Sequence, residues 1–257
     1  MNRLPVVLLM TGMVMVPHLT RSQDVFRDFQ TAHFLLHIES GISTEQARFV
    51  ADYLEQELGY LRGKLGMEPE RRMDVRLYAG DQRFRSATGS KSSDVVVVDR
   101  SVLHLPPLGR LEERHELAGT LSEGLSILFL ESSRERGAPE WLVRSFAAYQ
   151  SGRVANMTTP SGRRLHAFSD LSEEMQQAGP GDRERIQYLL GMTMKFLIDS
   201  YGADRAHALF KGFDRARSVE EVFQEVLGTP FATVEQSWSS FLATIIDDGS
   251  RRGSRGN

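Results

Sequence analysis

The sequence contains no cysteine among its 257 residues. This absence excludes a disulfide framework, a zinc site built from thiolates and a cysteine nucleophile. An excess of one charge is also lacking, since 31 lysines and arginines face 34 acidic residues and give a net charge of −3. A nucleic-acid-binding protein is therefore not indicated. With 40% hydrophobic residues the chain is typical of a globular protein. Any chemistry must rest on carboxylates, hydroxyls, histidines or the backbone.

The longest apolar run, residues 4–16, follows Arg3 near the N-terminus. It is shorter than the roughly 20 apolar residues of a membrane-spanning helix, and it matches the apolar part of a secretory signal. We therefore predict a signal peptide at residues 1–22 and an exported bacterial protein, periplasmic or extracellular. An uncleaved membrane anchor is the less favoured alternative. After cleavage we expect neither a membrane nor a nucleic-acid partner.

The first part of the remaining chain is predicted to form a small sheet with one packed helix. Alternating or β-branched residues indicate strands at 33–38, 73–78, 94–99 and 101–105. Ser43 and Gln46 form a capping box that opens a helix, and Gly66 closes it.

From Leu108 onward the apolar spacing is helical. A long helix is predicted at 108–131, followed by helices near 139–151, 183–201, 204–213, 219–227 and 233–246, with an irregular stretch at 153–181. The predicted organisation is an α/β part at 23–107, a helical part at 108–246 and a disordered tail at 247–257. Strands first and helices afterwards predict an α+β fold.

Several stretches, in order, resemble the peptidase MA-like family of gluzincin-type zinc metallopeptidases. They are AHFLLHIE with the helix and strand that follow it, PEWLVRSFAAYQSG at 139–152, and the closing helices at 186–213 and 218–242. The resemblance implies a gluzincin-like fold, in which the long helix at 108–131 borders the substrate cleft.

In that family, an H-E-x-x-H helix supplies two histidine ligands to zinc and a glutamate that activates a zinc-bound water. A second helix supplies a glutamate as third ligand in a Trp-Leu-x-Glu-Gly pattern. The resemblance places Ser122 and Ser126 at the histidine positions, Glu123 at the general-base position, and Arg144 at the third-ligand position. Serine hydroxyls are poor zinc ligands and a guanidinium cannot ligate. The resemblance therefore implies a vestigial site without a cofactor.

A second placement of the H-E-x-x-H motif on the sequence, which we call the second register, remains open. His115 and Glu116 begin a similar motif seven residues before Ser122, with Gly119 at the position of the second histidine. We favour the register of Ser122, because its spacing to Trp141 fits the family better and because it keeps the glutamate. Neither register contains two histidines.

The leading hypothesis is an exported, catalytically inactive protein that acts as a binding or structural module. Its former cleft would hold an extended peptide or a protein segment. Glu123 and Arg144 would form an ion pair across the cleft, so that charge replaces the metal as the link between two helices. The plainer interpretation is that both are solvated helix charges.

The alternative function is an active exported zinc metallopeptidase with unusual ligands, drawn from His115, Glu116, Glu123 and His104. His104 could line the cleft, although an ordinary strand residue is the simpler interpretation. His33 and His37 are expected on the polar face of a strand. The sequence does not indicate an oligomeric state.

Overall fold

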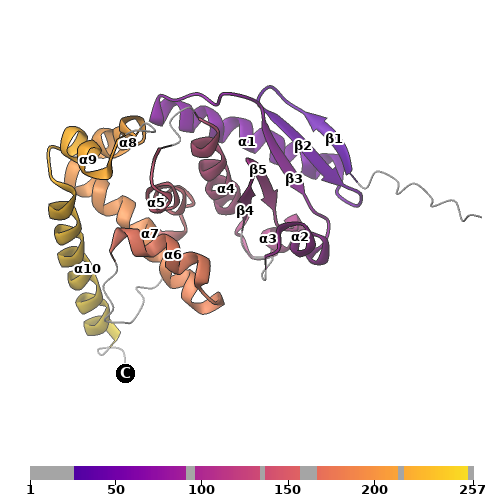
Figure 1. Ribbon diagram of the computed structural model, residues 1–257. Coiled ribbons are helices and arrows are strands. Elements are labelled where there is room, and N and C mark those ends of the chain that lie inside the picture. Colours follow the sequence, from indigo (N-terminus) through magenta and orange to yellow (C-terminus); the bar gives the residue numbers. More distant parts are fainter. Residues whose placement is uncertain (1–25, 91–95, 134–136, 157–166, 214–216, 254–257) are drawn as a thin grey trace, which may run out of the picture.

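The computed structural model describes residues 26–90, 96–133, 137–156, 167–213 and 217–253. The predicted signal peptide at residues 1–22 lies outside these ranges. Within them, no helix combines the length and the apolar character that crossing a membrane requires. Figure 1 shows the sheet on one side, a group of helices on the other, and helix α4 (Leu117–Ser132) between them.

The described strands form a five-stranded sheet in the order β1-β2-β3-β5-β4. Their bounds are β1 Phe26–Gln30, β2 Phe34–Glu39, β3 Met73–Leu77, β4 Val97–Asp99 and β5 Val102–Leu105. The three central strands are parallel, and each edge strand is antiparallel to its neighbour. Strands are confirmed in all four predicted segments, with β4 shorter than predicted. The sequence does not reveal β1, because its residues are only partly buried and show no alternation.

Helix α1 (Thr44–Leu65) connects the parallel strands β2 and β3 and confirms the predicted capping. The Ser43 hydroxyl accepts from the amide of Gln46, whose side chain accepts from the amide of Ser43. Gly66 closes the helix with φ +59°, a conformation that glycine adopts at little cost. Helix α2 (Asp81–Thr88) follows β3 and carries a single buried residue, Phe84, so no apolar period predicts it.

In the ranges that the structure describes, no strand pairs with the outer side of β4 in the hairpin of β4 and β5, so this edge of the sheet is open. Its two-residue turn, Arg100 and Ser101, has positive φ at both positions, which is typical of a type I′ turn. In such hairpins the residues flanking the turn exchange hydrogen bonds, here Asp99 with Val102. The next pair, Val98 with Leu103, is then not hydrogen-bonded. The peptide groups of Val98 therefore point away from β5, towards the free edge.

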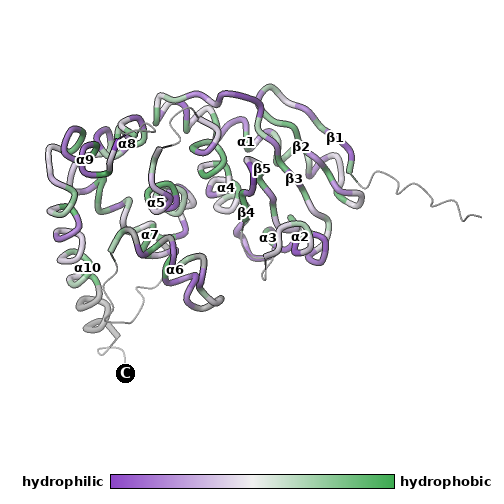
Figure 2. The backbone as a smooth tube through the Cα atoms, viewed as in Figure 1, coloured by the Kyte–Doolittle hydropathy of each residue, from purple (hydrophilic) through white to green (hydrophobic). Residues whose placement is uncertain are grey.

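The remaining elements are helical, which confirms the α+β class. They are α3 Leu108–Glu113, α4, α5 Glu140–Gln150, a 3₁₀ turn at Arg153–Asn156, α6 Phe168–Gln177, α7 Pro180–Tyr201, α8 Ala203–Gly212, α9 Val219–Leu227 and α10 Phe231–Gly253. Trp141 stacks on Phe168, which also stacks on Trp238, so aromatic contacts join α5, α6 and α10. Figure 2 shows apolar residues, in green, concentrated in α4, α5 and α7.

Two predicted boundaries were wrong. The helix predicted at 108–131 is divided into α3 and α4 at His115, whose φ is +56°. The break falls within the polar run 112–116, where the apolar spacing that would mark the end of a helix is missing. The tail predicted to be disordered from Asp247 instead continues helix α10 to Gly253. This stretch lacks proline, and of its two glycines Gly253 is the last residue of the helix, while Gly249 costs only about 1 kcal/mol of helix propensity.

Candidate functional site

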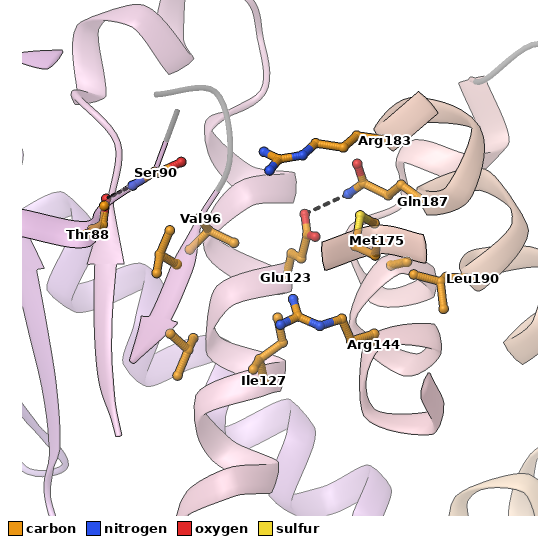
Figure 3. Close-up of a pocket in the computed structure, with 14 residues that line it drawn as sticks. Thr88, Ser90, Val96, Glu123, Ile127, Arg144, Met175, Arg183, Gln187 and Leu190 are labelled. Carbon is orange, nitrogen blue, oxygen red and sulfur yellow. Dashed lines mark hydrogen bonds between the residues drawn. The ribbon is translucent and has the colours of Figure 1, made fainter. Parts of the chain in front are cut away.

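A cavity of about 420 Å³ lies between the β4 end of the sheet and the helices α4 to α7. Its lining comprises Thr88, Gly89, Ser90, Val96, Val97, Val98, Glu123, Ile127, Arg144, Ala148, Met175, Arg183, Gln187 and Leu190. The structure thus brings Glu123 and Arg144, which the resemblance singles out, to one cavity (Figure 3). Most of the other lining side chains are apolar, so water competes less for the few polar groups.

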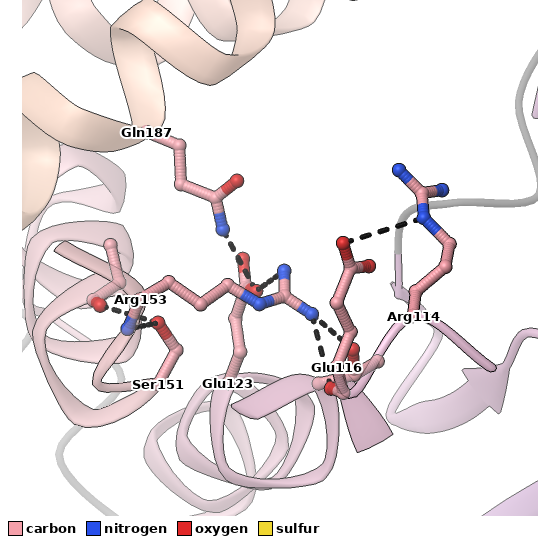
Figure 4. Close-up of polar contacts among 8 residues, drawn as sticks. Arg114, Glu116, Glu123, Ser151, Arg153 and Gln187 are labelled. Atoms are coloured by element: carbon pink, nitrogen blue, oxygen red, sulfur yellow. Dashed lines mark hydrogen bonds and ion pairs between the residues drawn. The ribbon is translucent and has the colours of Figure 1, made fainter. Parts of the chain in front are cut away.

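Glu123 is held in place by two donors. Its Oε2 accepts from Gln187 Nε2 at 2.9 Å and from Arg153 Nη1 at 3.2 Å, as Figure 4 shows. The side chain is only 12% exposed. Burial raises the pKa of Glu123, and this effect outweighs the opposing fields of Arg153 and Arg144 and the hydrogen bond from Gln187. The interpretation of Glu123 as a solvated helix charge is therefore wrong.

Arg153 joins the segment after α5 to the start of α4. Beyond Glu123, its Nη2 donates to the carbonyl oxygen of Glu116 at 3.4 Å and to the hydroxyl of Thr120. Gln187 adds a link from Glu123 to α7. Sequence reasoning missed Arg153, because no motif contains it. The available signal was chemical, since a glutamate on a buried helix face requires a donor or a cation nearby.

The predicted ion pair between Glu123 and Arg144 is replaced by two other pairs. Arg144 Nε donates to Glu140 Oε1 at 3.0 Å, one turn earlier on α5, while Glu123 pairs with Arg153. The prediction of an ion pair between Glu123 and Arg144 is therefore wrong, because Glu123 pairs with Arg153, which lies in the 3₁₀ turn after α5. Arg144 still points into the cavity beside Glu123 (Figure 3), and its positive charge opposes the rise in the pKa of Glu123 that burial causes.

The two serines at the predicted ligand positions are not in the cavity lining. The Ser122 hydroxyl lies 2.9 Å from the hydroxyl of Tyr53 on α1, within hydrogen-bonding distance. Ser126 is fully buried, and its hydroxyl finds no hydrogen-bond partner among the described residues. Both side chains are thus enclosed by packing around α4.

The second register is wrong as a helical motif. His115 lies between α3 and α4, and Glu116 is the N-cap of α4, where it pairs with Arg114 at 3.5 Å. A Cβ atom at Gly119 would lie 2.8 Å from the carbonyl oxygen of Ser151, which is closer than van der Waals contact allows. The position of the second histidine in that motif therefore has no room for a histidine side chain.

The residues present do not fit the zinc site of the resembled family. The two hydroxyls are enclosed, and the third position carries a permanent cation. In the ranges that the structure describes, no three histidine or acidic side chains lie close enough to share a metal ion.

The strand histidines have partners of their own. His104 is buried, and its Nδ1 lies 2.7 Å from the hydroxyl of Tyr78. Burial lowers the pKa of His104, and the residue does not line the cavity. His33 contacts Glu55 at 2.7 Å, and His37 contacts Asp28 at 2.8 Å. Each of the three histidines thus has a partner within the protein, and its position requires no ligand.

Comparison with models of protein families and with curated proteins gives no match for the chain. The resemblance to gluzincin-type peptidases therefore stays a prediction from its motifs. Function has to be inferred from the geometry of the cavity and of the sheet edge beside it.

Proposed function

We propose that this chain is an exported, catalytically inactive metallopeptidase-like protein whose cavity binds an extended peptide segment along β4. The observation that carries the proposal is the position of Val98. The peptide groups of Val98 point to the open edge of the sheet, and Val98 also lines the cavity. An extended peptide can add to such an edge by main-chain hydrogen bonds.

The cavity supports this mode of binding because it offers apolar surface beside the edge. Side chains of a bound strand point alternately to its two faces. Those facing the cavity would meet Ile127, Met175 and Leu190 from three different helices. Main-chain bonds would supply affinity, and these side-chain contacts would supply preference among peptides.

The absence of catalysis is supported by the residue types at the ligand positions, because Ser122, Ser126 and Arg144 cannot hold the zinc ion that would activate a water molecule. Glu123 accepts hydrogen bonds from Arg153 and Gln187 on Oε2, and these bonds tie α4 to two other segments. Its role in the proposal is to hold the walls of the cavity together.

Export is supported by the apolar run at residues 4–16 and by its short length, as argued from the sequence. The lack of cysteine is compatible with an oxidising compartment, since no thiol is exposed to oxidation there.

The proposal is tested with linear peptides selected on the full-length chain from a random octapeptide library. Their affinity is measured by fluorescence anisotropy after N-methylation of each peptide bond in turn. If the peptide adds to β4, affinity falls at alternate positions only, because every second amide faces the strand. Uniform tolerance of N-methylation would show that binding does not use the sheet edge.

Val98→Pro is the matching change in the protein. It removes the outward N–H without removing a bond to β5, and proline is tolerated at such edge positions. We expect about tenfold weaker binding, corresponding to ~1.4 kcal/mol for one lost hydrogen bond. Val98→Ala is the control, since it shortens the side chain and keeps the N–H. Equal affinities of both variants would contradict the proposal.

A further inference from the structure

One arginine of the cavity has no acidic partner. Arg183, in the first turn of α7, lines the cavity and donates from Nε to the carbonyl oxygen of Ala178 at 3.1 Å. Among the described residues, no carboxylate lies within ion-pairing distance of its guanidinium. The bond to Ala178 uses Nε, and no residue in the described ranges accepts a hydrogen bond from either Nη group.

The other charges of the cavity are already matched. Glu123 pairs with Arg153, and Arg144 pairs with Glu140. The acidic neighbour of Arg183 in sequence, Asp182, is 68% exposed and lies 3.9 Å from Arg185. Within the described part of the chain, Arg183 is therefore the cation of the lining that has no acidic partner.

The position of Arg183 suits an acidic group of a ligand that lies near the start of β4. Figure 3 shows its side chain extending from α7 above Glu123, towards the wall that carries Val96 and Ser90. The apolar side chains below it reduce the competition from water, which strengthens a hydrogen bond to a charged acceptor. Glu123 does not block such an acceptor, because Arg153 already balances its charge.

We infer that Arg183 binds a carboxylate of the peptide, either its C-terminus or an acidic side chain. This inference rests on the proposed function, because it assigns the chemistry of the same ligand. The two Nη groups of arginine match the two oxygens of a carboxylate. A phosphate group carries nearly two charges and is generally bound by a cluster of arginines, whereas this cavity holds one unmatched guanidinium.

Three octapeptide pools test the inference on the immobilised full-length chain. The first pool has a free C-terminus and no Asp or Glu, the second is amidated with one central Glu, and the third is amidated without acidic residues. Selected peptides from each pool are resynthesised, and their dissociation constants are measured. We expect the first or the second pool to bind about 10- to 100-fold more tightly than the third. The comparison of the first two identifies the source of the carboxylate.

Variants of the protein test whether Arg183 acts through its charge or through a structural role. Arg183→Gln should remove the advantage of the carboxylate pool and leave the affinity for the third pool unchanged. Arg183→Lys should keep part of the advantage, because it retains charge without the two-pronged geometry. Lys195→Gln is the control: this exposed cation lies on the same helix and outside the cavity lining.

The outcomes distinguish the inference from the function on which it rests. If all three pools bind equally, and Arg183→Gln changes none of them, the inference is overturned and peptide binding stands. If no pool yields a peptide that Val98→Pro weakens, both are overturned. A fall in the affinity of all three pools in Arg183→Gln would indicate a structural role for Arg183 and would also overturn the inference.

Discussion

Arg153 Nη1 lies 3.2 Å from Glu123 Oε2, so that the segment after α5 is tied to the middle of α4 by a partly buried ion pair. The exposed fractions of the two side chains are 20% and 12%. In the zinc site that the resemblance implies, a metal ion would link α4 and α5 through its ligands. Here a guanidinium and a carboxylate join neighbouring segments, and the hydrogen bond from Gln187 adds α7.

Arg153→Ala should destabilise the protein by about 2–4 kcal/mol, because it leaves the carboxylate of Glu123 buried without a cation. The measurement is the free energy of unfolding in urea at pH 7. Arg144→Ala is the control, since its pair with Glu140 is a half-exposed i,i+4 contact and should contribute no more than about 0.5 kcal/mol. Equal losses in the two variants would contradict the assignment of Arg153 as the link.

The raised pKa of Glu123 predicts a pH-dependent difference between the wild type and Glu123→Gln. Because the pKa is higher in the folded state, the folded protein binds more protons than the unfolded chain at pH values between the two pKa values. The stability of the wild type relative to the variant should therefore fall as pH rises from 4.5 through the raised pKa. Urea unfolding of both proteins from pH 4 to pH 8 measures this difference. A relative stability that rises over this range would show that the pKa is lowered instead.

Local signals in the sequence predicted local structure well. The capping box at Ser43 and the glycine at position 66 define both ends of α1, because these interactions involve residues close in sequence. The resemblance also singled out Glu123 and Arg144, and both line the cavity, although they do not form the predicted ion pair.

Contacts between distant segments could not be predicted in the same way. Arg153 lies 30 positions from Glu123, and no period of helix or strand relates them. The turn at His115 lies in a polar run, where the apolar pattern carries no information. Whether Arg183 has an acidic partner depends on where several acidic side chains point, and in the described part of the chain none reaches it, which the sequence alone does not specify.

Gly119→Ala should destabilise the protein by roughly 1–3 kcal/mol, although alanine favours helix over glycine by about 1 kcal/mol. The added Cβ atom would lie 2.8 Å from the backbone oxygen of Ser151, which cannot move without shifting the end of α5. Gly63→Ala on α1 is the matched control, because a Cβ atom there meets nothing within 4 Å. We expect this control to gain up to about 1 kcal/mol. Thermal and urea unfolding measure both changes, and a stabilised Gly119→Ala would contradict the close packing of α4 on α5.

Exposure to zinc should leave the full-length chain with far less than one zinc ion per molecule and with no hydrolysis of casein. The reason lies in the donors, since Ser122 and Ser126 are enclosed and Arg144 is a cation. Elemental analysis after dialysis measures the metal, and unfolding in the presence of a chelator measures its contribution to stability. We expect the chelator to change nothing, because a metal that bound the folded state would stabilise it. His115→Ala should leave both results unchanged. Stoichiometric zinc that disappears in His115→Ala would identify a metal site and overturn the proposal of an inactive protein.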